Sequence, residues 1–564
     1  MRRTNPNYAF TTAFVEALAA VGLRHVCITP GSRNSPLALP FADHPGITDW
    51  IHHDERSAAF YALGLAVTTR RPVAVVTTSG TAAAELHPAA VEARLARVPL
   101  LLLTADRPAE LRDVGAPQTI DQLDIFGTAA KWFHEVATPG PRLGGYATTL
   151  AARAWATALD LPAGPVHVNF PFRDPLAPVS VAGDVEEESE PAQPPTYVPG
   201  RLELDIAAVE EIARSVAGLR TLVVAGPLDR PRFPEAATEL ASRAAMPILA
   251  DPLSQLRAGD HDRAKVITTG DPLSRVGRLD ADLRPEAIIR FGATPTSQAL
   301  STWLAHHPEM PQIVVDEAGW RDPGASATIL VRSDPVSFAR QLAGVIGPTP
   351  EGWAAAWVEA DRAARAALTA SLMFPSEPGA VTGLAEAIPD DTILYVGSSM
   401  PVRDVDAFFP STDRRVRILA NRGANGIDGL ISSGLGAAAQ GDPVVILSGD
   451  LSLLHDLTAL GTAARLELPV TVIVLNNNGG GIFHFLPQAA FPQYFERLLG
   501  APHGTDFQGA ADLFGIEYHH VDDDPVFKAL VGTPTGSPRL IEVRTDRIEN
   551  VAIHEKAWQA VAGT

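Results

Sequence analysis

The stretch from Val444 to Phe483 reads VVILSGDLSLLHDLTALGTAARLELPVTVIVLNNNGGGIF. It contains two aliphatic runs, with about one helix's length of sequence between them. Runs that are apolar at every position are typical of strands buried on both faces of a parallel sheet. The first run ends at Asp450 and the second at Asn477, where Asn and Gly, both poor strand formers, follow. The stretch therefore predicts a β–α–β unit with polar residues at the carboxyl ends of both strands.

The same pattern recurs along all 564 residues, a length too great for one hydrophobic core. Helical patterns separate the apolar runs nearly throughout. The alternation predicts the α/β class, and we expect several doubly wound parallel sheets. The nine further runs are residues 25–29, 73–78, 98–104, 166–170, 221–226, 287–292, 312–316, 392–397 and 416–420.

Two breaks divide the chain. Residues 184–200 are acidic and Pro-rich and are typical of an exposed linker, while GPTPEGW at 347–353 is a weaker break before an Ala-rich helix. Three domains are therefore expected, at 1–185, 200–347 and 375–564. Polar stretches follow the strands of the first and third blocks most often, so we expect those two to carry the chemistry. Both blocks contain an apolar strand, a Ser-Gly pair and a helix in succession, a similarity too weak to prove duplication.

Composition excludes several classes of protein. The net charge of −20 argues against a nucleic-acid or anionic-membrane partner, although local basic pockets stay open. Cys27 is the single cysteine, so no intrachain disulfide forms, and none of the four lysines follows a glycine as in a phosphate-binding Walker loop. No apolar run is long enough to span a bilayer, and Glu16 interrupts the apolar residues near the N-terminus, which favours a helix over a signal peptide. A cytoplasmic enzyme is expected.

Asp450 and Asn477 together suggest a cation site. Paired strands lie about 4.8 Å apart, so the two side chains could reach one ion if their strands are neighbours. A carboxylate, an amide oxygen and a backbone carbonyl suit Mg²⁺ or Ca²⁺, and Mg²⁺ commonly completes its shell with phosphates. The glycines at 479–481 would let a diphosphate approach the backbone. The alternatives are a helix N-cap at Asp450 and an ordinary turn at the Asn-Gly run.

These two motifs resemble the thiamine-diphosphate enzymes. GDLSLLHD (449–456) followed by NNNGGGIF (476–483) is similar to the metal–diphosphate motif of that superfamily, which implies bound Mg²⁺, with Mn²⁺ as the alternative. Leu451 stands where the superfamily usually has Gly, which narrows the choice of subfamily. The implied metal ligands are Asp450, Asn477 and the carbonyl of Gly479. The residues implied in cofactor binding are Glu55, Ile427, Gly449, Asp450, Leu451, Asn477 and Gly479.

Glu55 begins the helical pattern of WIHHDERSAAFYALG. An acid at a helix N-terminus is common on protein surfaces. The resemblance implies more, because the matching Glu of thiamine-diphosphate enzymes is catalytic and donates a proton to the aminopyrimidine ring. A proton-donating carboxyl needs apolar surroundings that raise its pKa, and SAAFYALGLA offers them. The preceding His52 and His53 would point to opposite faces of a strand, so no metal site is expected there.

Seven motifs occurring in order narrow the resemblance. They are PGSRNSPL, DERSAAF, TSGTA, TADRP, RGANGIDG, GDLSLLHD and NNNGGGIF. Together they are similar to the family of 2-succinyl-5-enolpyruvyl-6-hydroxy-3-cyclohexene-1-carboxylate synthases of menaquinone biosynthesis. That family implies pyrimidine-binding (1–185), central (200–347) and diphosphate-binding (375–564) domains. It also implies a transferase that decarboxylates 2-oxoglutarate and adds the succinyl-semialdehyde carbanion to isochorismate. A homodimer or homotetramer is implied, in which Glu55 of one subunit completes a site on another.

Arginines at strand ends suit such substrates, because guanidinium forks match carboxylates and both substrates are dicarboxylates. The alternative for each arginine is a surface ion pair. Gln298 stands where the family often has Lys, which leaves a contact from the central block open. The residues implied in substrate binding are Ser32, Arg33, Arg107, Gln118, Ser399, Arg403, Arg422, Ile482 and Phe483.

Three rival hypotheses stand beside this one. GLGAAA at 434–439 fits a dinucleotide-binding pattern, but no strand directly precedes it, so packing of small residues on a helix is favoured. A non-catalytic relative would lack the set of Glu55, Asp450 and Asn477. Another thiamine-diphosphate 2-keto acid decarboxylase or an acetolactate-type synthase stays open, with Leu451 and the arginines arguing against it.

Overall fold

The computed structural model describes residues 5–180 and 193–564. Contacts divide the chain into two compact units. Unit 1 consists of Met1–Pro199, Asn421–Gly441 and His455–Leu468, and unit 2 consists of Gly200–Ala420, Asp442–Leu454 and Pro469–Thr564. Much of the expected linker, residues 184–192, lies outside the described residues, and 193–200 contains no helix or strand. The three expected domain boundaries stay a prediction.

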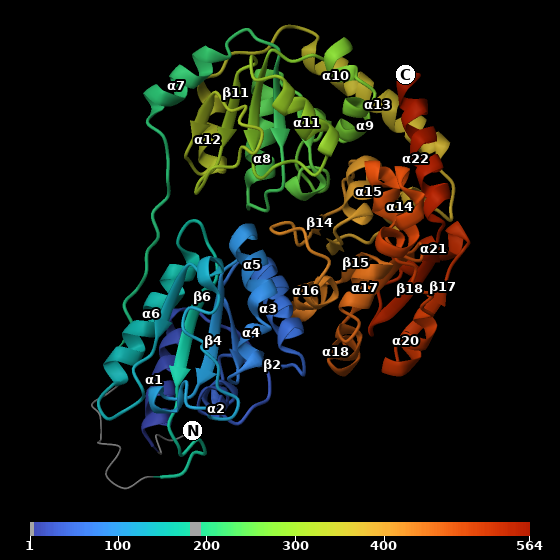
Figure 1. Cartoon of the computed structure of the whole chain (residues 1–564). Coiled ribbons are helices and arrows are strands. Elements are labelled where there is room, and N and C mark those ends of the chain that lie inside the picture. Colours follow the sequence, from blue (N-terminus) through green and yellow to red (C-terminus); the bar gives the residue numbers. More distant parts are fainter. Residues whose placement is uncertain (1–4, 181–192) are drawn as a thin grey trace. The chain divides into compact units, whose positions relative to one another are not determined.

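Unit 1 is built on a six-stranded sheet whose pairings are all parallel, in the order β2-β1-β3-β4-β6-β5. Helices α1 and α6 cover one face (Figure 1) and bury Phe14 and Trp155 against the sheet. The strands are β1 (His25–Ile28), β2 (Thr48–Ile51), β3 (Val73–Thr77), β4 (Leu100–Asp106), β5 (Trp132–Glu135) and β6 (Val166–Pro171). The helices are α1 (Pro6–Val21), α2 (Ser35–Asp43), α3 (Glu55–Thr69), α4 (Thr81–Ala84), α5 (His87–Ala96), α6 (Gly144–Leu159), α16 (Leu430–Ala437) and α18 (Ala459–Arg465).

Unit 2 contains two further sheets. The first is parallel, with the order β12-β11-β10-β7-β8-β9. Counted along the chain, this is the strand order of dinucleotide-binding folds, with the reversal of direction between β7 and β10. The strands are β7 (Thr221–Ala225), β8 (Ile248–Ala250), β9 (Val266–Ile267), β10 (Ala287–Phe291), β11 (Gln312–Val315) and β12 (Ile329–Val331). The helices of this part are α7 (Ile206–Ser215), α8 (Phe233–Ala244), α9 (Gly270–Arg275), α10 (Arg278–Ala281), α11 (Gln298–His306), α12 (Pro335–Val345) and α13 (Trp353–Ser371).

The other sheet of unit 2 has the order β14-β13-β15-β16-β18-β17 and is also parallel. When the strands of each sheet are numbered in chain order, this order is the same as in unit 1. The similarity between the first and third blocks therefore extends to the whole sheet. The strands are β13 (Thr392–Val396), β14 (Val416–Leu419), β15 (Val444–Gly449), β16 (Val470–Asn476), β17 (Glu517–His520) and β18 (Arg539–Arg544). The helices of this part are α14 (Glu377–Ala387), α15 (Met400–Phe408), α17 (Asp450–His455), α19 (Pro492–Phe495), α20 (Phe507–Phe514), α21 (Asp524–Gly532) and α22 (Arg547–Ala562).

The predicted β–α–β unit is present with one correction. Strands β15 and β16 pair directly, with Gly449 beside Leu475. Two short helices, α17 and α18, replace the single expected helix. The break falls at Asp456, whose buried carboxylate accepts hydrogen bonds from the backbone and hydroxyl of Ser432 and the hydroxyl of Ser57. These long-range contacts hold the Asp456 side chain at the break.

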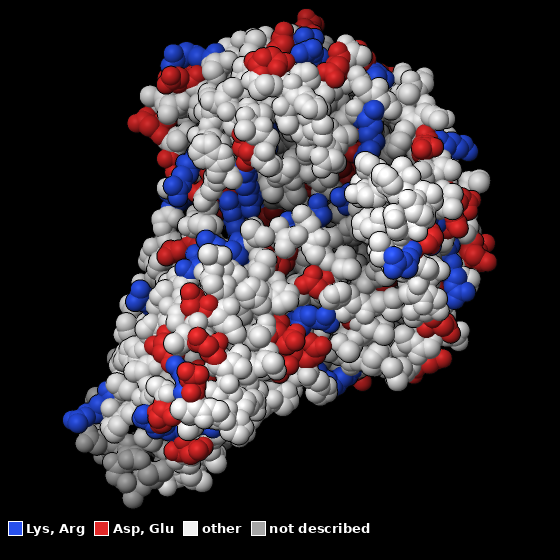
Figure 2. Space-filling view, viewed as in Figure 1, with Lys and Arg blue, Asp and Glu red and all other residues white. Residues whose placement is uncertain are grey.

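All eleven apolar runs are strands, so the predicted α/β fold with three doubly wound parallel sheets is confirmed. GLGAAA lies in and just after α16, where a Cβ on Gly436 would lie 2.0 Å from the Tyr61 carbonyl oxygen. The small residues therefore serve helix packing. Of the helices that the structure describes, none is long and apolar enough to cross a membrane. Charged side chains of both signs are interspersed over the face seen in Figure 2.

Candidate active site

Strands β15 and β16 end side by side, and the polar residues that follow them meet. We name this group the Asp450 cluster: Glu377, Asp450, Asn477, Gly479 and His503. One oxygen of Asp450 accepts the Leu451 backbone N–H at 2.7 Å. The other accepts the Gly479 N–H at 2.9 Å and lies 3.2 Å from His503 Nε2. Asp450 is 2% exposed, so these contacts are made inside the protein.

Asn477 contributes an amide oxygen that has no partner. Its Nδ2 donates to Glu377 Oε1 at 2.8 Å, while its Oδ1 is buried and accepts no hydrogen bond. A buried polar atom without a partner costs free energy, and such atoms are few in native proteins. A cation beside Asp450 would satisfy this oxygen. The structure therefore offers one carboxylate, one amide oxygen and one nearby backbone carbonyl, a donor set suited to Mg²⁺.

The glycine run also has a structural reason within the protein. Gly479 has φ +138°, and a Cβ there would lie 1.9 Å from the Gly500 carbonyl oxygen. A Cβ on Gly480 would lie 2.2 Å from the Leu499 carbonyl oxygen. These glycines therefore let the backbone around residues 499–500 approach closely. Open space lies instead beside Gly449, where a Cβ would meet nothing within 4 Å. The approach of a diphosphate to the glycines at 479–481 stays a prediction.

Two buried acids, Glu377 of the Asp450 cluster and Asp404, influence each other. Glu377 is the first residue of α14 and is 1% exposed. Burial, reinforced by the Asp404 carboxylate, raises the pKa of Glu377 to about 7. Asp404 itself accepts a 2.8 Å bond from His554. No three His, Cys, Asp or Glu side chains group as metal ligands within the described chain, so any cation here would depend on amide and carbonyl oxygens as well.

Ser399 and Arg403 follow β13, the neighbour of β15. Ser399 has φ +71° and ψ −130°, a region that residues other than glycine rarely adopt. Arg403 donates to the Ser399 carbonyl at 2.6 Å, which holds the guanidinium over the start of α15. Strained backbone of this kind concentrates at functional sites, and here it falls on a residue that the resemblance implies in substrate binding.

Unit 1 has its own polar group at the carboxyl ends of β3 and β4. Arg107 donates to the Gln118 carbonyl at 2.8 Å and to the Ser79 hydroxyl. Gln118, with φ +55°, donates in turn to the Ser79 carbonyl at 2.9 Å. Arg33 donates to the Phe172 carbonyl at 2.9 Å. Burial, followed by the nearby Arg33 charge, lowers the pKa of Arg107.

Glu55 is the first residue of α3 and is half-buried. The cap of that helix is Asp54, whose side chain accepts the Ser57 N–H at 2.9 Å, so Glu55 is not needed as the cap. His52 follows β2 rather than lying in it, and burial lowers its pKa to about 3, so it stays neutral at ordinary pH. Glu55 is therefore the first residue of α3, and its carboxyl group does not cap the helix.

The glycine-rich loop after β14 belongs to unit 1. Glu92, buried on α5, accepts the backbone N–H groups of Gly423 at 2.7 Å and Ala424 at 2.6 Å. Burial raises the pKa of Glu92, although these two hydrogen bonds act to lower it. The carboxylate thus anchors the loop that carries Arg422 and Ile427.

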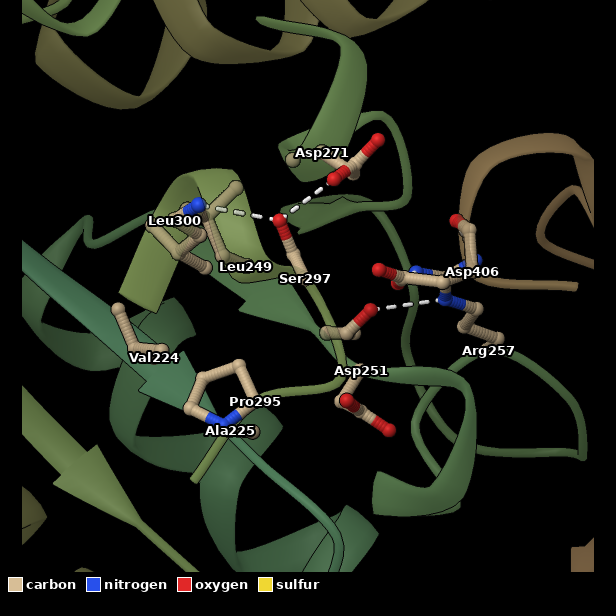
Figure 3. Close-up of a pocket in the computed structure, with 12 residues that line it drawn as sticks. Val224, Ala225, Leu249, Asp251, Arg257, Asp271, Pro295, Ser297, Leu300 and Asp406 are labelled. Atoms are coloured by element: carbon tan, nitrogen blue, oxygen red, sulfur yellow. Dashed lines mark hydrogen bonds and ion pairs between the residues drawn. The ribbon is translucent and has the colours of Figure 1, made fainter. Parts of the chain in front are cut away.

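A second buried polar group lies where β7, β8 and β10 end (Figure 3), at the reversal point of the middle sheet. We name it the Arg257 cluster: Asp251, Arg257, Asp271, Ser297 and Asp406. Arg257 is 1% exposed; it donates to Asp406 at 2.7 Å and to four carbonyl oxygens. The Ser297 hydroxyl donates a hydrogen bond to the Asp271 carboxylate and accepts one from the Leu300 backbone N–H. The remaining cavity, ≈ 10 Å³, has room for about one water molecule. A dinucleotide does not fit there.

The chain is similar to known proteins along almost its whole length. A synthase of 2-succinyl-5-enolpyruvyl-6-hydroxy-3-cyclohexene-1-carboxylate from Geobacillus kaustophilus is 47% identical over 562 residues, which cover 98% of this chain and 97% of that protein. The synthases of that name from Chloroflexus aurantiacus and Listeria innocua are 44% and 38% identical, each over 98% of this chain and 96% or 97% of their own. The chain belongs to this synthase family. Residues 9–125 match the N-terminal and residues 409–543 the C-terminal thiamine pyrophosphate (diphosphate) binding domain of thiamine pyrophosphate enzymes.

The predicted site residues of this family member fall into two sets, one in each compact unit. Asp450, Asn477 and Gly479 come together, as do Arg107 and Gln118. The set in unit 1 is Ser32, Arg33, Glu55, Arg107, Gln118, Arg422 and Ile427. The set in unit 2 is Ser399, Arg403, Gly449, Asp450, Leu451, Asn477, Gly479, Ile482 and Phe483.

Four residues around these sets carried no prediction. Ser79 lies in a polar strand-end stretch that pointed to the right place without giving it a role. Glu377, Glu92 and His503 had no local signal, because each acts through a contact with a residue far away in the sequence.

Proposed function

We propose that this synthase family member decarboxylates 2-oxoglutarate and adds the resulting succinyl-semialdehyde carbanion to isochorismate, with release of CO₂, in menaquinone biosynthesis. The observation that carries the proposal is the similarity to synthases of this product over 98% of the chain. The buried, partnerless Asn477 Oδ1 beside Asp450 supports a cation site within the region that matches a thiamine-pyrophosphate-binding domain. Thiamine diphosphate, when bound, supplies the stabilisation of the carbanion. The protein binds, orients and moves protons.

In this proposal Asp450, Asn477 and the Gly479 carbonyl hold Mg²⁺, with Mn²⁺ as the alternative metal. The fit rests on the hard oxygen donors and on the unpartnered amide oxygen. The open space beside Gly449 takes the diphosphate, and Leu451 lines the same turn. Ile427 in the glycine-rich loop supports the cofactor. Glu55 supplies a proton from its carboxyl group to the aminopyrimidine ring.

The substrate carboxylates are bound by arginines in this proposal. Arg33 and Arg107 both follow strands of unit 1, and the Arg33 charge helps to lower the pKa of Arg107. Arg403 donates to the Ser399 carbonyl in unit 2. Guanidinium forks suit carboxylates, and the two substrates together carry several. The other residues proposed to line the substrates are Ser32, Gln118, Ser399, Arg422, Ile482 and Phe483.

The active assembly in this proposal is a homodimer or homotetramer. Glu55 and Asp450 belong to different compact units, and the resemblance pairs them between subunits. Exposed apolar side chains of unit 2, Phe491, Tyr494 and Leu498, each more than half exposed, suit burial by another copy. A cytoplasmic location completes the proposal, because the substrates and the cofactor are small charged molecules.

Mass spectrometry of the product tests the reaction. The purified chain with isochorismate, 2-oxoglutarate, thiamine diphosphate and Mg²⁺ should yield the succinylated cyclohexene carboxylate and CO₂. Pyruvate in place of 2-oxoglutarate serves as the control, since it lacks the second carboxylate. Acetolactate from pyruvate, without product from 2-oxoglutarate, would replace this proposal by the acetolactate-type alternative.

A further inference from the structure

Glu377 is a buried carboxylate with long-range partners. Its Oε1 accepts the Asn477 Nδ2 at 2.8 Å and the Thr545 hydroxyl at 3.3 Å. It forms no ion pair with any described residue. A helix dipole favours an acid in the first turn. The dipole explains neither the burial of Glu377 nor its contact with a residue 100 positions away. The carboxylate therefore needs a further explanation.

The contact decides which end of the Asn477 amide points where. An amide has a donor end and an acceptor end, and Glu377 in its ionised form can only accept. Glu377 therefore keeps Nδ2 on its own side and turns Oδ1 away from it. A Cβ on Gly481 would lie 2.5 Å from Nδ2, so glycine there leaves room for the amide group. The result is the buried Oδ1 without a hydrogen-bond partner.

We propose that Glu377 is a positioning residue that keeps the Asn477 oxygen aimed at the cation site beside Asp450. The inference rests on the proposed function, which assigns Asn477 to the metal. Glu377 does not touch the cation itself. Its role is that of an outer partner that fixes a ligand's orientation, and loss of such partners typically weakens metal binding 10–100-fold.

Direct titration with Mg²⁺ at saturating thiamine diphosphate tests the inference, followed by calorimetry and without substrates. Glu377→Gln presents either an oxygen or an NH₂ group to the amide, so the orientation is no longer fixed. Glu377→Asp keeps the negative charge, but its shorter side chain moves the carboxylate away from Asn477 Nδ2. We expect both variants to bind Mg²⁺ about 10-fold or more weakly.

Asp404→Asn is the matched control. Asp404 is as buried as Glu377 and accepts a bond from His554, and no hydrogen bond joins it to Asn477. Its substitution removes the same charge and should change Mg²⁺ affinity less than about threefold. Equal losses in Asp404→Asn and Glu377→Gln, with none in Glu377→Asp, would mean that charge rather than orientation matters, and would overturn the inference.

A double substitution isolates orientation further. In Asn477→Asp the side chain has two equivalent oxygens and nothing to orient. Glu377→Gln should then no longer weaken Mg²⁺ binding, and its NH₂ group should favour binding by donating to the new carboxylate. An undiminished penalty in this background would also overturn the inference.

The outcomes separate this inference from the proposed function. Wild-type Mg²⁺ affinity in both Glu377 variants refutes the inference alone. Tight Mg²⁺ binding by the wild type without product refutes the proposed reaction alone. A wild type that binds thiamine diphosphate without Mg²⁺ refutes the metal site and the inference together. Circular dichroism without metal checks folding, and if Glu377→Gln does not fold, Glu377→Asp carries the test.

Discussion

The two buried polar clusters of unit 2 differ in how completely their atoms are paired. Both lie where parallel strands end, and both contain buried acids. In the Arg257 cluster the guanidinium meets Asp406 and four carbonyls, and no buried side-chain nitrogen or oxygen of its five residues lacks a partner. In the Asp450 cluster the Asn477 oxygen is buried without one.

The difference separates a structural role from a binding role. A sheet edge at a reversal of strand order is a common ligand site, and the middle sheet has the order of dinucleotide-binding folds. Its edge is nevertheless closed by Arg257, which bonds the C-terminal end of α15. Polar atoms that satisfy one another stabilise the fold, whereas a buried atom left unsatisfied beside a carboxylate is consistent with a bound ion. The following predictions test this distinction.

Arg257→Ala should have the largest effect. It leaves the buried Asp406 carboxylate without its cation and removes the bonds to α15. Breaking a buried ion pair costs about 3–5 kcal/mol, so the free energy of unfolding of unit 2 should fall by about that much. Urea unfolding followed by circular dichroism measures it. The affinity of the folded fraction for thiamine diphosphate should change less than about threefold. A loss below about 1 kcal/mol, or a selective loss of cofactor binding, would remove the distinction between the clusters.

Asp450→Ala should reverse that pattern. A lost metal ligand should cost more than the 10–100-fold in affinity typical of outer partners, so cofactor binding in Mg²⁺ should weaken by more than about 100-fold. Unfolding free energy should fall by about 1–3 kcal/mol, less than in Arg257→Ala, because the Leu451 and Gly479 N–H groups lose their acceptor. Calorimetric titration with thiamine diphosphate and Mg²⁺ measures the first quantity. Asp406→Ala, which removes another buried acid, is the control. It should lower the free energy of unfolding without a specific loss of cofactor affinity.

Asp456→Asn tests the distinction in unit 1. Both oxygens of Asp456 are paired, which predicts a structural role. Burial raises its pKa to about 6. Because the folded state keeps its proton where the unfolded state has lost it, stability should fall as pH rises from about 4 to 6 and stay level above. This loss in the free energy of unfolding is about 2–3 kcal/mol. Thermal unfolding across this range should show the slope in the wild type and its loss in Asp456→Asn. An unchanged slope would exclude Asp456 as its source.

The sequence predicts the interiors of the sheets better than their edges, for a physical reason. The apolar runs correspond to strands buried on both faces. Strands β2 and β17 form sheet edges and carry exposed polar residues, so no apolar run marks them. Strand β18 is interior but carries Glu542, which is fully buried and accepts bonds from Asn476, Tyr518 and Arg544. Only the tertiary structure provides those partners.

The same reasoning applies to the candidate site. Asp450 and Asn477 can be predicted because a strand end is a local feature and parallel strands end together. Glu377 and His503 reach the same place from distant segments, so no local pattern indicates them. The glycine run follows Asn477 directly, but the close approach of Gly500 that it allows lies outside the motif.

Gly449→Ala should have the smallest effect and defines where the open space of the Asp450 cluster lies. A Cβ there meets nothing within 4 Å, so the free energy of unfolding should stay within about 0.5 kcal/mol of wild type. If the diphosphate occupies that space, the added methyl group overpacks the complex. Overpacking costs about 1–3 kcal/mol, so affinity for thiamine diphosphate should fall about fivefold or more. Calorimetry with cofactor and Mg²⁺ measures the change.

Gly479→Ala is the matched control, because its Cβ would meet the Gly500 carbonyl at 1.9 Å and its φ of +138° disfavours any side chain. It should lose folding stability with or without cofactor, by at least the 1–3 kcal/mol of a strained backbone. One added methyl group would then give two results, weaker binding at Gly449 and weaker folding at Gly479. Unchanged cofactor affinity in Gly449→Ala would mean that the diphosphate lies elsewhere. The partnerless Asn477 oxygen would then be the remaining mark of a ligand in this cluster.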